Sequence, residues 1–290
     1  MNNAYIETLR PRQWTKNVVI FAGLIFDGQF LQASPFLRVL AATLLFCLVS
    51  GITYTINDIL DVEADRLHPT KKNRPIASGR LSKKQATIYV IILSIFSLVA
   101  SYLLSPKLSL ILIAYTLLFL AYSLWLKKFL IVDVFIIAAG FVLRVLAGLS
   151  VIQPNYFSPW LLVLTSLLAA YLGFGKRLGE LKLLENNAGS TRKTLEGYTI
   201  PLLNQYIQIV ISAILITYTL YTFSAHSEQP SYAMMLTIPF VAYGIFRYLY
   251  LLQNETITAA PEEVLLKDRP LQITILLWGL MVIVIIYFVF

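Results

Sequence analysis

The chain changes from apolar to acidic at Asn57-Asp58-Ile59-Leu60-Asp61-Val62-Glu63-Ala64-Asp65, directly after an apolar run of membrane-span length, residues 37–56. At about 100° per residue, Asp58, Asp61 and Asp65 fall on one face of a helix. Three carboxylates on one face repel one another unless a cation gathers them. Mg²⁺ prefers such oxygen ligands, and substrate phosphates commonly complete its shell. The spacing therefore predicts a Mg²⁺ site at the mouth of a membrane helix, with these three aspartates as metal ligands and catalytic residues.

The neighbours of the aspartates refine this interpretation. Asn57 extends the same face and is a candidate substrate-binding residue, whereas Glu63 points to the far side. A row of solvated surface acids would have a similar composition. The apolar run before the stretch and the dense run of Lys and Arg after it favour a binding site instead.

The composition is that of a polytopic membrane protein. Of 290 residues, 58% are hydrophobic and 13% are charged, about half the charged fraction of a typical soluble domain. Apolar stretches of span length predict an all-α fold of nine transmembrane helices around a central cavity, in one domain over residues 1–290. The expected spans are 17–34, 37–56, 86–104, 108–126, 130–152, 158–174, 201–223, 232–252 and 271–290.

The basic residues indicate the orientation of these spans. With the N-terminus in the cytoplasm, nineteen of the 23 Lys and Arg lie in cytoplasmic segments, and only Arg38 and Lys107 lie outside. Such an excess is the positive-inside pattern. It predicts a multi-pass protein of the plasma membrane with its active-site loops, 57–85 and 175–200, in the cytoplasm. The net charge of +8 is spread over short loops, which argues against nucleic acid as a partner.

The loop after the aspartates is rich in cations that suit phosphate. An Arg fork matches phosphate oxygens bidentately, and Lys acts as a point charge. Arg66, Lys72 and Arg74 are therefore candidate phosphate-binding residues, although part of the loop's charge also serves orientation.

A second polar group begins the loop 175–200. Lys176, Arg177 and Glu180 share one helical arc, and we expect Lys176 and Arg177 to be catalytic and Glu180 to bind substrate. Glu180 could equally be only a salt-bridge partner of its neighbours.

Further polar residues fall within or beside spans. Arg144 lies deep in the expected span 130–152, where an unpaired charge costs several kcal/mol, so it should face a polar cavity or a partner. Asp133, with Lys127 or Lys128, extends this polar lining. Tyr54 and Tyr122 are also candidate substrate-binding residues, although such aromatics are more often interfacial or core residues.

The acidic stretch resembles the first aspartate-rich motif of the UbiA superfamily of intramembrane prenyltransferases, whose fold surrounds a central cavity. The resemblance covers essentially the whole chain. It departs at the second site, where typical members carry another Asp-x-x-x-Asp pattern and this chain reads Gly175-Lys176-Arg177-Leu178-Gly179-Glu180-Leu181.

That departure resembles the decaprenyl-phosphate phosphoribosyltransferase branch, which makes 5-phosphoribosyl-1-phosphoryl polyprenol for cell-wall arabinan. The other matching motifs are Arg10-Pro11-Arg12-Gln13-Trp14-x-Lys16-Asn17, Arg74-Pro75-Ile76-Ala77-Ser78-Gly79, Phe141-Val142-Leu143-Arg144, and Pro261-Glu262 with Asp268-Arg269-Pro270. The resemblance implies Mg²⁺ as cofactor, phosphoribosyl pyrophosphate as donor and a polyprenyl phosphate as acceptor. It adds Lys16 and Asn17 to the substrate-binding residues, and homo-oligomerisation stays open.

Two other functions compete. An aromatic or quinone-type prenyltransferase of the same superfamily would use a prenyl diphosphate, but the Lys-Arg-x-x-Glu pattern disfavours it. A transporter for an anionic solute would place polar groups near the midplane and along both vestibules. Here the polar groups crowd one face and the outer loops are nearly uncharged.

Overall fold

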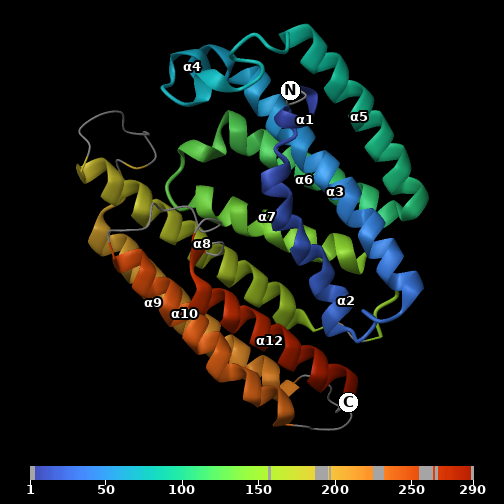
Figure 1. The fold of residues 1–290 in the computed structure, drawn as a ribbon, viewed down its shortest axis with the longest axis vertical. Helices are drawn as coiled ribbons and strands as arrows, with labels where there is room; N and C mark the ends of the chain where they lie inside the picture. Colours follow the sequence, from blue (N-terminus) through green and yellow to red (C-terminus); the bar gives the residue numbers. More distant parts are fainter. Residues whose placement is uncertain are drawn as a thin grey trace. The chain divides into compact units, whose positions relative to one another are not determined.

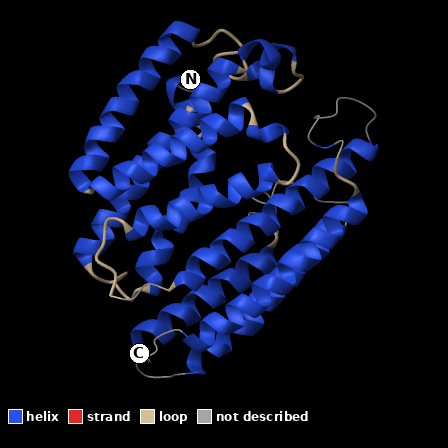
Figure 2. Cartoon of the chain, turned by 180° about the vertical axis from the view of Figure 1, so that it is seen from behind, coloured by secondary structure: helices blue, strands red, loops and turns tan. Residues whose placement is uncertain are grey.

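The computed structural model describes residues 4–155, 158–186, 195, 197–224, 232–254, 264 and 267–288. Within these ranges every regular element is helical (Figure 2). The described part of the chain contains eight helices that are long and apolar enough to cross a membrane. The all-α, multi-pass architecture expected from the sequence is therefore confirmed.

The long helices follow the expected spans. They are α3 (Ala33–Leu60), α5 (Lys83–Leu104), α6 (Pro106–Leu124), α7 (Val132–Leu149), α8 (Pro159–Asn186), α9 (Ile200–Ser224), η5 (Tyr232–Thr237) with α10 (Ile238–Gln253), and α12 (Arg269–Phe288). Two helices continue well beyond their expected ends at residues 56 and 174. These are α3, whose extension carries the start of the acidic stretch, Asn57 to Leu60, and α8, whose extension carries the Lys176 group.

The first expected span, 17–34, has a different form. A short α1 (Ala4–Thr8) precedes a 3₁₀ helix, η1 (Pro11–Phe21), which continues into α2 (Ala22–Phe26). A 3₁₀ helix rises about 2.0 Å per residue against 1.5 Å in an α-helix. Residues 11–26 therefore extend about 30 Å, which is the thickness of the hydrocarbon core. This segment is long enough to cross a bilayer although no long α-helix forms.

Contacts group the chain into two compact units, one comprising Met1–Trp125 with Leu143–Asn155 and the other Leu126–Val142 with Tyr156–Phe290. In the first unit α3 is the central helix, packed against η1, α5 and α6 (Figure 1). Ser82 starts α5 with a capping box, in which its hydroxyl accepts from the Gln85 N–H and the Gln85 side chain accepts from the Ser82 N–H. The single residue Ser105 links α5 to α6, whose first turn opens on Pro106.

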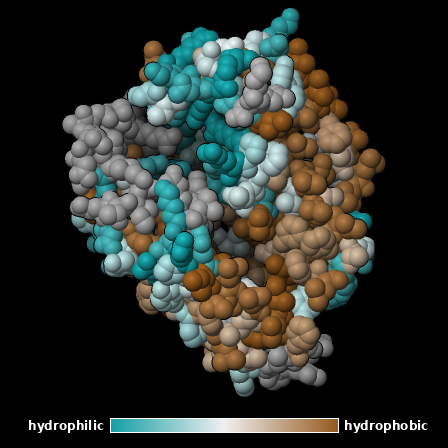
Figure 3. All heavy atoms as spheres, viewed as in Figure 1, coloured by the Kyte–Doolittle hydropathy of each residue, from teal (hydrophilic) through white to brown (hydrophobic). Residues whose placement is uncertain are grey.

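From Ile88 onward the outer face of α5 is largely apolar (Figure 3). Its exposed large side chains are Ile88, Ile91, Ile92, Ile95, Phe96, Leu98, Val99, Tyr102 and Leu103. In water such a surface would be a liability, but lipid tails cover it without cost. Polar side chains gather instead at the end of the first unit where α4 (Val62–Leu67) follows α3 (Figures 1 and 3).

In the second unit α8 packs along α9, and α10 packs along α12. Asp268 connects α10 and α12. Its carboxylate accepts from the Leu271 N–H at 2.9 Å, which caps α12, and pairs with Arg247 of α10 at 2.8 Å. The hydrogen bond from Arg247 lowers the pKa of Asp268, so the cap stays charged. The other part of that motif, Pro261-Glu262, lies outside the described residues.

A close backbone approach fixes α7 against η1 in the first unit. A Cβ atom added at Gly148 would lie 2.0 Å from the carbonyl oxygen of Ile20. Because the obstacle is backbone, a side chain at this position would push the two elements apart.

We expect Gly148→Ala to lower thermal stability, by about 1–3 kcal/mol as in other overpacked sites. Gly279→Ala on α12 is the matched control, since a Cβ there meets nothing within 4 Å. Tryptophan-fluorescence melting of the purified protein measures both variants. Equal melting temperatures for the two would contradict the close approach.

Candidate active site

The acidic stretch lies where α3 ends and α4 begins. α3 ends at Leu60, and Asp61 (φ −93°, ψ 11°) interrupts the helix before α4. Backbone hydrogen bonds nevertheless run from Asp61 N–H to Asn57 at 2.9 Å and from Asp65 N–H to Asp61 at 2.8 Å. The helical phase therefore continues across the interruption, as the face prediction requires.

The four acidic side chains differ in exposure, as this helical phase requires. Asp58 and Asp65 are buried, Asp61 is half-buried and Glu63 is exposed. Glu63 pairs with Arg66 at 3.0 Å, away from the buried aspartates. The expectation that Glu63 points to the far side is confirmed.

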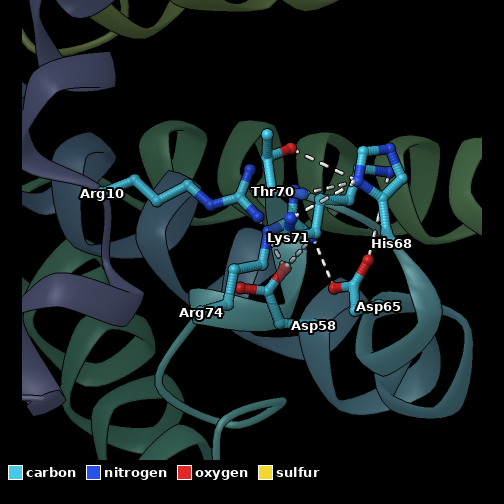
Figure 4. A network of polar contacts seen from close by, with 7 residues as sticks. All are labelled: Arg10, Asp58, Asp65, His68, Thr70, Lys71 and Arg74. Carbon is cyan, nitrogen blue, oxygen red and sulfur yellow. Dashed lines mark hydrogen bonds and ion pairs between the residues drawn. The ribbon is translucent and has the colours of Figure 1, made fainter.

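Three cations meet the two buried aspartates (Figure 4). Nη1 of Arg74 lies 3.0 Å from Asp58 Oδ1 and 2.6 Å from Asp65 Oδ2, so one guanidinium nitrogen bridges both carboxylates. Arg10 donates to the same Asp58 oxygen at 2.5 Å. Lys71 lies 4.0 Å from Asp65. The buried negative charge is thereby compensated by protein cations.

Arg10 is a site residue that the sequence reasoning missed. It has φ 51° and ψ 64°, a left-handed conformation that costs a non-glycine residue about 1–3 kcal/mol. Its guanidinium also lies over the Tyr54 ring, 4.8 Å from the centroid. The only sequence signal was its place in the motif that opens at Arg10-Pro11.

The donor set fits a hard divalent cation. Asp58 and Asp65 present oxygens from two helices to a single positively charged atom, and carboxylate oxygens are what Mg²⁺ binds. Among the described residues, however, no three His, Cys, Asp or Glu side chains are gathered closely enough to hold a metal. Arg74, expected only as a phosphate ligand, stands between two of the expected metal ligands.

The remaining cations of this loop lie in different settings. Arg66 pairs with Glu63, and its Nε lies 3.4 Å from the Ala77 carbonyl oxygen. Lys72 is exposed in η2 (Lys71–Asn73). Lys16 is half-buried on η1. Only Arg74 of the three predicted phosphate-binding residues in the loop contacts the aspartates in this structure.

Arg144 and Asn17, predicted from separate motifs, lie together inside the first unit. Arg144 Nε donates to the Asn17 side-chain oxygen at 2.8 Å, and Nη2 donates to the Tyr115 hydroxyl at 3.0 Å. The guanidinium also lies about 5 Å from the rings of Phe46 and Tyr115. The expected partners of this buried arginine are therefore present, but Tyr115 and Phe46 carried no sequence signal.

The second unit holds its own buried ion cluster. Arg177 lies 2.8 Å from Asp133 and also pairs with Glu180, one turn along α8. Tyr198 donates to Asp133 at 3.2 Å and accepts from the Ile131 N–H at 2.9 Å. Burial raises the pKa of Tyr198, and the Asp133 carboxylate raises it further, so the phenol remains a donor.

The other predicted residues are placed as follows. Lys176, next to Arg177, is half-buried on α8, and Lys128 is exposed in η3 (Leu126–Lys128). Tyr122 belongs to α6 of the first unit, where its ring lies 6.1 Å from Phe119. Glu180 is the salt-bridge partner that the sequence allowed it to be. Arg177 is thus held between two carboxylates.

We expect Arg177→Ala to destabilise the protein by about 3–5 kcal/mol, since it leaves Asp133 buried without its cation. Arg66→Ala removes an exposed pair with Glu63 and should cost at most about 1 kcal/mol. Thermal melting of both purified variants is the measurement. A stable Arg177→Ala protein would show that the buried pair is not structural.

Comparison with known proteins agrees with the sequence motifs. Residues 18–267 match the model of the UbiA prenyltransferase family. The decaprenyl-phosphate phosphoribosyltransferase of Mycolicibacterium smegmatis is 35% identical over 94% of this chain and 89% of its own length. The enzyme of the same name from Corynebacterium glutamicum is 32% identical over 97% of this chain and 86% of its own length.

Solved structures share the fold. A UbiA homolog from Archaeoglobus fulgidus bound to GPP and Mg²⁺ superimposes with a TM-score of 0.73 at 18% identity, covering 98% of this chain and 99% of that one. A digeranylgeranylglyceryl phosphate synthase gives 0.68 at 19% identity, covering 98% of each chain. At such identities the likeness concerns the fold alone.

Proposed function

We propose, because the chain belongs to the UbiA prenyltransferase family, that it transfers 5-phosphoribose from phosphoribosyl pyrophosphate to a polyprenyl phosphate and releases pyrophosphate. The observation that carries the proposal is the 35% identity over 94% of the chain to an enzyme named decaprenyl-phosphate phosphoribosyltransferase. The basic second group supports it, since Lys176 and Arg177 replace the acidic pair of a typical prenyl diphosphate enzyme.

The residues of the first unit suit the diphosphate end of the donor. Asp58, Asp61 and Asp65 would hold Mg²⁺, which when bound neutralises the charge that builds up on the departing pyrophosphate. Arg10 and Arg74 already lie at these aspartates. Their guanidinium groups can donate to phosphate oxygens, and Tyr54 keeps Arg10 in place.

The chemistry needs no general base from the protein. The bond between C1 of the ribose and the pyrophosphate oxygen breaks, and a bond from C1 to an acceptor phosphate oxygen forms. The acceptor oxygen is already anionic, so no proton has to be removed. The protein's contribution is orientation of the two substrates and stabilisation of the positive charge developing at C1.

The second group suits the separate 5-phosphate of the donor. A donor with phosphate at both ends of a sugar needs positive charge besides the metal. Lys176 is half-buried beside the buried Arg177, whose own charge is offset by Asp133 and Glu180. We therefore assign the direct phosphate contact to Lys176 and assign Arg177 and Glu180 to its support.

Lys16, Lys72 and Lys128 lie at the surface or near it and can contact either phosphorylated substrate. Asn17 and Arg144 are bound to each other inside the first unit. We propose that this pair supports η1, which carries Lys16. Asn57 and Tyr122 remain candidate substrate-binding residues.

Purified protein should transfer label from phosphoribosyl pyrophosphate to a short polyprenyl phosphate when Mg²⁺ is present and should lose this activity with a chelator. Asp58→Asn and Asp65→Asn should abolish turnover because they remove metal-binding charge. Glu63→Gln, on the exposed side of the same stretch, is the matched control and should keep at least half of the activity.

The same preparation also tests the competing function. Given a prenyl diphosphate and 4-hydroxybenzoate, the protein should form no prenylated product. Aromatic prenylation without any transfer from phosphoribosyl pyrophosphate would replace the proposal with a quinone-type prenyltransferase.

We further propose that the protein lies in the plasma membrane with the aspartate loop in the cytoplasm, as the charge distribution indicates. Lys83, exposed at the start of α5, and Gln153, exposed between α7 and α8, provide the test. Lys83→Cys should react with an impermeant thiol reagent only from the cytoplasmic side, and Gln153→Cys only from the other. The reverse pattern would invert the topology. Cys47 is buried and gives little background.

A further inference from the structure

We propose that Arg74 occupies the place of the divalent cation between Asp58 and Asp65 in the resting protein, and that metal binding releases it to the diphosphate. The inference rests on the metal part of the proposed function and adds a competition within the site. Arg74 then competes with the metal for the two aspartates. When metal and diphosphate are both present, Arg74 binds the diphosphate instead.

The contact geometry is that of a bridging cation. An arginine that pairs with a single carboxylate usually presents two nitrogens to its two oxygens. Here one nitrogen, Nη1, lies 3.0 Å from Asp58 and 2.6 Å from Asp65. A metal that bridges both carboxylates would have to lie between them, where Nη1 of Arg74 stands, so Arg74 and the metal exclude each other.

Neither neighbouring cation bridges the two carboxylates. Arg10 contacts only Asp58 of the pair, comes from a left-handed backbone position and lies over the Tyr54 ring. Lys71 is 4.0 Å from Asp65 and so makes a looser contact. Arg74 instead follows the short helix η2 with an extended backbone (φ −60°, ψ 147°), and its guanidinium group stands between the two carboxylates. It is therefore the cation that a metal bound to both carboxylates has to displace.

Displacement has an electrostatic consequence. A divalent cation arriving alone must break two ion pairs and leave a guanidinium group beside added positive charge. A diphosphate that arrives with the metal provides new acceptors for that guanidinium group. Loss of Arg74 should therefore act in opposite directions on the two binding events.

Binding of Mn²⁺, a spectroscopic substitute for Mg²⁺, can be measured on the full-length protein in nanodiscs by electron paramagnetic resonance of the free ion. Arg74→Ala and the more conservative Arg74→Gln should bind Mn²⁺ alone about tenfold more tightly, equivalent to about 1.4 kcal/mol. In the presence of Mn²⁺ both should bind inorganic pyrophosphate about tenfold more weakly than the wild type.

Lys84→Ala is the matched control, because it removes the same charge from an exposed position at the start of α5, where the residue has no role in the site. It should change either affinity less than twofold, which excludes a general effect of net charge. Arg74 variants that bind Mn²⁺ no better than Lys84→Ala, or that bind pyrophosphate normally, would overturn the inference. So would absence of Mn²⁺ binding in every variant. Opposite shifts in a protein that fails to transfer phosphoribose would uphold the inference and refute the proposed function.

Discussion

A carboxylate buried at the end of a membrane helix has to be matched by positive charge, and the polar end of the first unit is built around this requirement. Asp58 and Asp65 are each 3% exposed. An unpaired buried carboxylate would cost several kcal/mol, a large part of the net stability of a typical domain. Arg10, at the start of η1, contacts Asp58. Lys71 and Arg74, in the turn after α4, contact Asp65. The charge balance thus ties two separate segments to the aspartates of α3 and α4.

Buried arginines meet the same requirement in two other ways. Arg177 is held by two carboxylates, Asp133 and Glu180, so its charge is offset within the second unit. Arg144 is bound by the neutral side chains of Asn17 and Tyr115 and by the faces of aromatic rings. Hydrogen bonds and ring faces stabilise a guanidinium group without cancelling its charge. The two arginines therefore look alike in the sequence but have different electrostatic settings.

The sequence predicted what depends on local periodicity. The span positions and the exposure of Glu63 follow from apolar run lengths and from the 3.6-residue repeat, and both are found in the structure. Partners far apart in the chain could not be predicted in this way. Arg10 and Asp58 are 48 residues apart, and Asn17 and Arg144 are 127 apart. The 3₁₀ form of η1 was also missed, because hydropathy reports the length of a span and not its helix type.

The numbers of charges at the aspartates explain why a metal and a diphosphate suit this site better together than apart. Asp58 and Asp65 contact three cations, Arg10, Lys71 and Arg74. With the half-buried Asp61 on the same helical face, the charges of the group are close to balance. A divalent cation alone would leave an excess of positive charge, and a diphosphate alone would leave an excess of negative charge. Either excess is costly in a poorly hydrated setting. Their joint entry changes the net charge least, because the guanidinium group that gives up the aspartates finds phosphate oxygens in their place.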